Sequence, residues 1–193
     1  MKTTVLSTLF GLTFLAFGAF NANAQYDYGS DEEACKRNYS LYKEYLKQKA
    51  YKDALPFWRK TYEICPKFHY VLYKDGVEIV EEVKIKGATD AAVQKEGIDT
   101  LMMLYDQWIE YFPEKKGYVY GKKGVDAYSF KMYDVAYESL KKSLEIEDDN
   151  SQASPILRYF QAVIRQVQDG KLDSVAIFEA YDFTQDILER RIT

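Results

Sequence analysis

The chain has 193 residues, with 26 lysine and arginine residues against 30 aspartate and glutamate residues, and its formal net charge is −4. Nucleic-acid binding depends on clustered basic side chains that neutralise phosphates, so this acidic balance argues against a nucleic-acid partner. Aromatic residues make up 16% of the chain, and most of them must pack inside it.

The N-terminus has the pattern of a targeting segment. Lys2 supplies a positive charge, residues 5–20 are largely apolar, and Ala22-Asn23-Ala24 fits a small-x-small cleavage site. The apolar run is short for a membrane span, and an uncleaved anchor is the alternative. We therefore predict a signal peptide over residues 1–24, a linker over 25–30, and an exported periplasmic or extracellular chain without an integral membrane span. Losing Lys2 takes the net charge from −4 to −5, and the remaining 169 residues suffice for one domain with a substantial core.

Residues 35–68 carry a spaced pattern typical of a helical hairpin. Leu41 and Tyr45 lie four apart and share one face of a first helix, as Ala54 and Trp58 do on a second. Ala54 lets the two helices approach closely, and Trp58 fills the space one turn later. Pro66 disfavours helix at the residue before it, so the second helix should end near Cys65. This pattern resembles the tetratricopeptide repeat (TPR), a 34-residue unit of two antiparallel helices.

Related patterns follow along the chain. Gly76 occupies the small-residue position of a longer second unit, which ends at Pro113 and whose extra length is assigned to the turn at residues 87–90. Gly124 and Ala136 mark a third unit, and the sequence predicts no strand at residues 118–120. In a fourth unit, Ser154 and Pro155 resemble an N-cap and first-turn pair, and Asp173 opens the last helix.

We therefore predict an all-α fold over residues 31–193, a right-handed α-solenoid of about four TPR-like antiparallel helical hairpins. Its expected repeat-packing residues are Leu41, Tyr45, Ala54, Trp58, Pro66, Gly76, Gly124 and Ala136. The Cys-Pro-Lys segment after the first unit also resembles secreted repeat proteins common in Bacteroidota.

The resemblance has a consequence for Cys35 and Cys65, the only cysteines. They occupy the first and thirty-first positions of one unit, where the start of the first helix meets the end of the second. Because export favours oxidation, we expect a disulfide between them, with two buried free thiols as the alternative. A thiol–imidazole pair of Cys65 with His69, or zinc bound by both cysteines and His69, is disfavoured by the spacing.

Other chemical motifs are weak. The acidic run at residues 145–150 lacks the glycine and closing glutamate of a calcium-binding EF-hand loop, so a solvated turn is favoured. His69 is the sole histidine, and no G-x-S-x-G elbow occurs. We predict no catalytic residues, no metal and no cofactor, and a chain that is not an enzyme.

The resemblance implies a scaffold for a protein or peptide partner, because the first helices of such repeats usually line the inner surface. By family position this points to partner-binding residues Tyr39, Lys43 and Lys47 on the first unit, with Lys122 and Tyr128 on the third. Lysine with tyrosine suits an acidic or C-terminal peptide segment, and plain solvent-exposed helix is the alternative for each residue.

A structural subunit of a cell-envelope assembly is the alternative function. Apolar residues of the last helix, residues 173–192, fall on more than one face. We therefore predict an exposed apolar strip at this end and association through the C-terminal helix.

Overall fold

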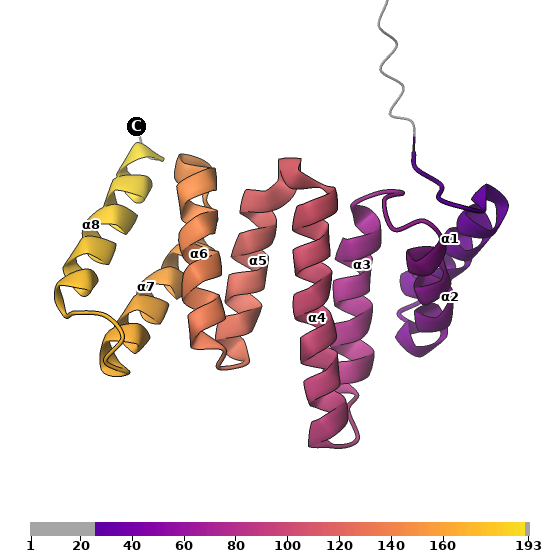
Figure 1. The fold of residues 1–193 in the computed structure, drawn as a ribbon, viewed down its shortest axis with the longest axis horizontal. Coiled ribbons are helices and arrows are strands. Elements are labelled where there is room, and N and C mark those ends of the chain that lie inside the picture. The colour runs from indigo at the N-terminus through magenta and orange to yellow at the C-terminus, as the bar shows by residue number, and fades with distance from the viewer. Residues whose placement is uncertain (1–25, 192–193) are drawn as a thin grey trace, which may run out of the picture.

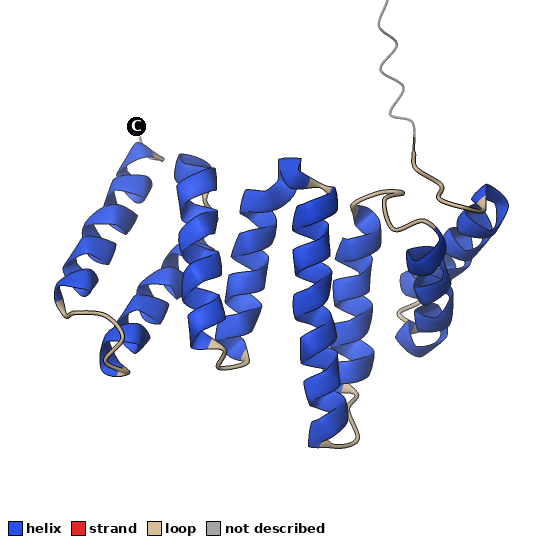
Figure 2. Ribbon diagram, viewed as in Figure 1, coloured by secondary structure: helices blue, strands red, loops and turns tan. Residues whose placement is uncertain are grey.

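The computed structural model describes residues 26–191. The predicted signal peptide, its cleavage site and Ile192 lie outside the described residues. The helices are α1 (Glu32–Lys47), α2 (Tyr51–Ile64), α3 (Val71–Val80), α4 (Ala91–Tyr111), α5 (Lys116–Ser129), α6 (Tyr133–Glu147), α7 (Ala153–Gln168) and α8 (Val175–Arg190). Figure 2 shows helices and loops, with no strand in this part of the chain.

Successive helices pair into four hairpins, α1–α2, α3–α4, α5–α6 and α7–α8, and each hairpin packs on the next. The hairpins follow one another along the long axis of the molecule in chain order, ending with α8 (Figure 1). The prediction of an all-α helical-repeat fold with four antiparallel hairpins is therefore confirmed.

Small residues allow the close helix packing that the sequence pattern predicts. A Cβ atom on Gly76 of α3 would lie 2.4 Å from Cζ2 of Trp58, whose indole Nε1 donates a 2.9 Å hydrogen bond to the Leu72 carbonyl. A Cβ atom on Gly124 of α5 would lie 2.4 Å from Cγ of Leu140. Ala54 and Ala136 are fully buried, and Pro66 lies half-buried just after α2.

The predicted buried face of α1 needs correction. Leu41 is 38% exposed, and Tyr42 occupies the core position instead. The reason is the register of the helix, because its buried face runs through Cys35, Asn38 and Tyr42 at intervals of three and four residues. Tyr45 lies beside this face, half-buried, and its ring stacks on Phe57 with centroids 5.6 Å apart.

The second hairpin owes its length to its helices more than to its turn. Asp90 caps α4 by accepting hydrogen bonds from the backbone N–H groups of Ala92 and Val93, so the predicted turn lies where expected. The extra residues, however, extend α4 to 21 residues and prolong α3 as a π-helical segment, Glu81–Lys86. In Figure 1, this hairpin projects below its neighbours.

The last hairpin confirms one prediction and corrects another. Four residues of α8 expose large apolar side chains, at 56% for Val175, 71% for Phe178, 56% for Tyr181 and 39% for Leu188. This is the predicted apolar strip. Ser154, by contrast, is not an N-cap, because α7 begins at Ala153 and has no side-chain cap.

Candidate functional site

The two cysteines form the predicted disulfide. Cys35 and Cys65 are both buried, with their sulfur atoms 2.05 Å apart and their Cα atoms 6.0 Å apart. The bond joins the first turn of α1 to the C-cap of α2. Since neither sulfur is a free thiol, the thiol–imidazole and zinc interpretations do not fit this structure.

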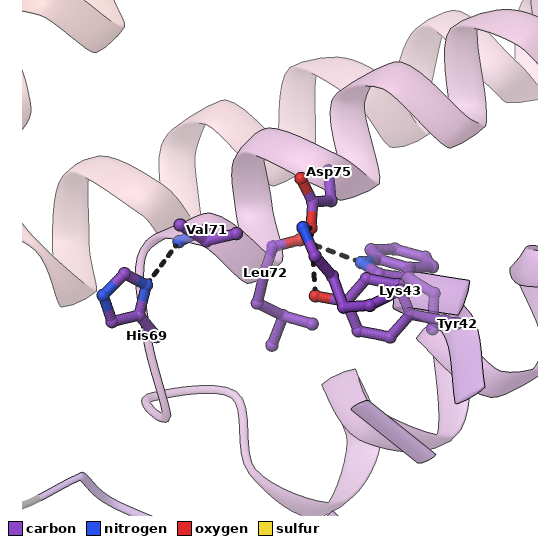
Figure 3. Close-up of polar contacts among 7 residues, drawn as sticks. Tyr42, Lys43, His69, Val71, Leu72 and Asp75 are labelled. Atoms are coloured by element: carbon purple, nitrogen blue, oxygen red, sulfur yellow. Dashed lines mark hydrogen bonds and ion pairs between the residues drawn. The ribbon is translucent and has the colours of Figure 1, made fainter. Parts of the chain in front are cut away.

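His69 has a local structural role. Its Nδ1 accepts a hydrogen bond from the backbone N–H of Val71 at 3.1 Å, at the start of α3 (Figure 3). Burial is the main cause that lowers the pKa of its imidazole. Among residues 26–191, no cluster of three or more histidine, cysteine, aspartate or glutamate side chains is arranged to hold a metal ion.

A buried aspartate on α3 engages the first predicted lysine. Asp75 is only 5% exposed, and its Oδ2 lies 2.7 Å from Nζ of Lys43 and 3.2 Å from the hydroxyl of Tyr42 (Figure 3). Burial, together with the charge of Asp75, raises the pKa of Tyr42, which keeps its hydroxyl proton for this hydrogen bond. Lys43 therefore joins the first two hairpins, and the geometry does not support its predicted contact with a partner.

The other four predicted partner-binding residues are not brought together by shared contacts. Tyr39 packs its ring against Tyr42 and Phe68, and Lys47 pairs with Glu44 at an exposed site. The Tyr128 ring lies 5.1 Å from the guanidinium of Arg158. Of the five, only Lys122 lines a groove of appreciable size.

That groove lies between α3 and α5, with residues of α4 at its base, and we call it the α3–α5 groove. It consists of two cavities, of about 430 Å³ and 220 Å³, that share the lining residues Lys74, Trp108 and Tyr118. The larger cavity is also lined by Tyr70, Glu114, Lys115 and Glu147, and the smaller by Val77, Glu78, Glu81, Tyr105 and Lys122.

Trp108 is the residue with unmet hydrogen-bonding capacity in this groove. Its side chain is 2% exposed, and its indole Nε1 has no hydrogen-bond acceptor among the described residues. The ring lies 6.3 Å from that of Tyr70, nearly parallel to it, and 6.2 Å from that of Tyr118, edge to face. A buried tryptophan N–H usually finds an acceptor, because leaving it unpaired costs free energy.

Charges of both signs surround the aromatic residues. Lys74, Lys115 and Lys122 are exposed, and Nζ of Lys115 lies 5.8 Å from the Tyr70 ring centroid. At the α4 wall, the Tyr105 hydroxyl donates to Asp126, whose pKa is raised above its ordinary value, mainly by burial. Four glutamates, Glu78, Glu81, Glu114 and Glu147, line it as well. The groove thus combines aromatic walls, a buried donor and side chains of both charges, a combination that suits a polar chain whose anionic groups pair with the lysines.

Three residues of this groove, Lys74, Trp108 and Tyr118, were not predicted as site residues. Trp108 belongs to a run of apolar residues at intervals of three and four, which identifies a buried helix face and nothing more. No sequence signal separates it from the other core residues of α4, because its importance depends on the gap between α3 and α5.

The fold and the groove define a helical-repeat protein with TPR-like hairpins. No protein-family model and no curated protein matches the chain significantly. Among solved structures, a crystal structure of MamA protein is similar, with a TM-score of 0.38 and 14% identity, over 84% of this chain and 94% of that chain. At this level of similarity, the description of the fold rests on the eight helices themselves. None of the described helices is both long and apolar enough to cross a membrane.

Proposed function

We propose that this chain is an exported, non-enzymatic scaffold that binds a protein or peptide partner in the α3–α5 groove. The observation that carries the proposal is the buried Trp108 N–H without an acceptor, in a groove that the lysines border. Stacked hairpins offer extended surfaces of this kind to binding partners.

The chemistry of the groove favours an extended acidic or C-terminal peptide segment. Because Nε1 of Trp108 is buried, the side chains that cover it would have to move before a carbonyl or carboxylate oxygen of the ligand accepts from the indole. Tyr70 and Tyr118 would contact its apolar atoms, and Lys74 and Lys122 would pair with its negative charge. This keeps the kind of partner that the sequence predicted and retains Lys122. The proposed site lies between α3 and α5, and not along Tyr39, Lys43 and Lys47 of α1.

Export to the periplasm or beyond the cell is part of the proposal. It is supported by the N-terminal targeting pattern and by the Cys35–Cys65 disulfide, since structural disulfides persist in oxidising compartments. The lineage resemblance noted above stays a prediction.

The test is affinity capture of the tagged mature chain from its native envelope, followed by affinity measurements with the captured partner. Trp108→Phe removes the indole N–H and keeps an aromatic ring, so it should weaken binding about tenfold, the value of one hydrogen bond of about 1.4 kcal/mol. Lys74→Ala with Lys122→Ala should weaken binding and reduce its salt dependence. The matched control is Lys52→Ala, an exposed lysine on α2.

Circular dichroism should show that each variant remains folded. A captured partner that binds Trp108→Phe and the double lysine variant as tightly as the wild type would place the binding site elsewhere.

A second candidate function is a structural subunit of a cell-envelope assembly, associating through the C-terminal end. The exposed apolar side chains of α8 favour it, since contiguous exposed apolar surface marks interaction sites.

A further inference from the structure

The exposed apolar side chains of α8 form one row. Phe178, Tyr181 and Leu188, with Gln185 between the last two, follow one another at intervals of three, four and three residues. Residues at this spacing lie on one face of a helix. A neighbouring face, about 100° away around the helix, packs into the hairpin through Ala180, Thr184 and Ile187, so the row is left outside the core.

The row borders an apolar groove between α7 and α8. The groove has a volume of about 350 Å³, and its lining includes Leu157 and Phe160 of α7 and Tyr181, Gln185 and Leu188 of α8. Leu157, on the α7 side, is 57% exposed. The helices that form this α7–α8 groove make the last hairpin of the row (Figure 1).

The preceding hairpin shows what such a surface accommodates. There, α7 packs against both α5 and α6, so one helix covers the surface of the hairpin before it. The equivalent surface of α7 and α8 has no helix on it among the described residues. An amphipathic helix is therefore the shape that fits the α7–α8 groove, with its apolar face down.

A second row on α8 specifies the charge of that helix. Glu179, Asp182, Asp186 and Glu189 repeat the same three, four, three spacing, one residue later, and all four are exposed. No lysine or arginine in residues 26–191 forms an ion pair with Glu179, Asp182 or Asp186, whereas Glu189 accepts a hydrogen bond from Gln185. Glu179 lines a separate cavity together with Lys141 of α6, so the acidic row that runs beside the apolar one consists of Asp182, Asp186 and Glu189.

The acidic row argues against a second copy of this chain as the occupant. Two copies related by a two-fold axis would present the same surface to each other. Their acidic rows would then flank one shared interface, and like charges placed together oppose association. A helix carrying lysine or arginine beside its apolar face would instead pair with the row.

We propose that the α7–α8 groove docks an amphipathic helix of a different protein, whose apolar face covers Phe178, Tyr181 and Leu188 and whose flanking basic residues pair with the acidic row. This rests on the proposed function only in that the chain is a protein-binding scaffold. It uses a different surface from the α3–α5 groove, so each proposal can fail without the other.

The probes are two synthetic helices as long as α8, with the same leucine-rich apolar face. One carries lysine beside that face and the other glutamate. Fluorescence anisotropy of the labelled helices with the mature chain should show at least tenfold tighter binding of the lysine helix, with a difference that shrinks at high salt. Phe178→Ser with Leu188→Ser should abolish binding, and because both side chains are exposed, the fold should persist.

Charge neutralisation tests the acidic row directly. Asp182→Asn with Asp186→Asn should weaken binding of the lysine helix about fourfold, since an exposed ion pair contributes roughly a factor of two. The matched control, Glu63→Gln with Glu138→Gln, removes two exposed charges from α2 and α6 and should change nothing.

Several outcomes would overturn the proposal. The first two are equal affinity for the two helices and binding of neither helix. The third is a loss of affinity in the Trp108→Phe variant, which would show that the helix binds in the α3–α5 groove. Sedimentation that shows self-association of the wild type, abolished by Phe178→Ser with Leu188→Ser, would identify a second copy as the occupant.

Discussion

Removing the Cys35–Cys65 disulfide should lower the free energy of unfolding by about 3.6 kcal/mol. The two cysteines are separated by 30 positions in the chain. In the chain-entropy model, a cross-link that closes a loop of about 30 residues lowers the conformational entropy of the unfolded chain. At 25 °C this raises the free energy of the unfolded state by about 3.6 kcal/mol. For a domain of this size, each kcal/mol corresponds to roughly 2–4 °C, so the melting temperature should fall by roughly 7–14 °C.

The position of the bond adds a local effect. It joins the start of α1 to the end of α2 in the first hairpin, which packs on the rest of the chain from one side. Without it, α1 and α2 should separate from the other hairpins more readily. Tryptophan fluorescence, to which Trp58 on α2 contributes, should then change at lower urea concentrations than far-ultraviolet circular dichroism does.

The assay is urea denaturation of the mature wild type and of Cys35→Ala with Cys65→Ala, followed by both signals. Reductant should destabilise the wild type by a similar amount and leave the variant unchanged, which controls for effects of the substitution itself. A difference below about 1 kcal/mol, or a response of the variant to reductant, would refute the reasoning.

Two further predictions concern Gly76 and Asp126. Gly76→Ala should destabilise the chain by about 2–3 kcal/mol in urea denaturation, because its Cβ would lie 2.4 Å from the Trp58 ring. Gly170→Ala, where φ is +70° and no atom lies within 4 Å, should cost only about 1 kcal/mol; equal effects would contradict the packing argument. Burial raises the pKa of Asp126 above its ordinary 3.8. At pH values between the unfolded and the folded pKa, the folded state therefore binds more protons than the unfolded state. The contribution of this carboxyl to the free energy of unfolding then falls as pH rises. The stability of the wild type relative to Asp126→Asn should therefore decrease from pH 3.5 to pH 7 in urea denaturation, and a constant difference would show that burial does not perturb this group.

The sequence by itself determined the helices and most of their ends, because these depend on local forces. Intervals of three and four between apolar residues identify helices. Pro66 and Pro113 follow the ends of α2 and α4, and the Asp90 side chain caps the start of α4. The exposed strip on α8 was also predictable, since a helix with apolar residues on several faces cannot bury all of them in one hairpin.

Tertiary structure decided which face of each helix is buried and where a partner could bind. Leu41 and Tyr42 are both apolar and differ by 100° around α1, so periodicity alone could not choose between them. In the folded chain Tyr42 is buried, and Asp75, which lies 33 positions beyond it, engages both Tyr42 and Lys43. Trp108 likewise lines a groove only because residues of α3 and α5 border the same cavities. Such long-range juxtapositions arise from the packing of whole helices, and no local pattern of residues encodes them.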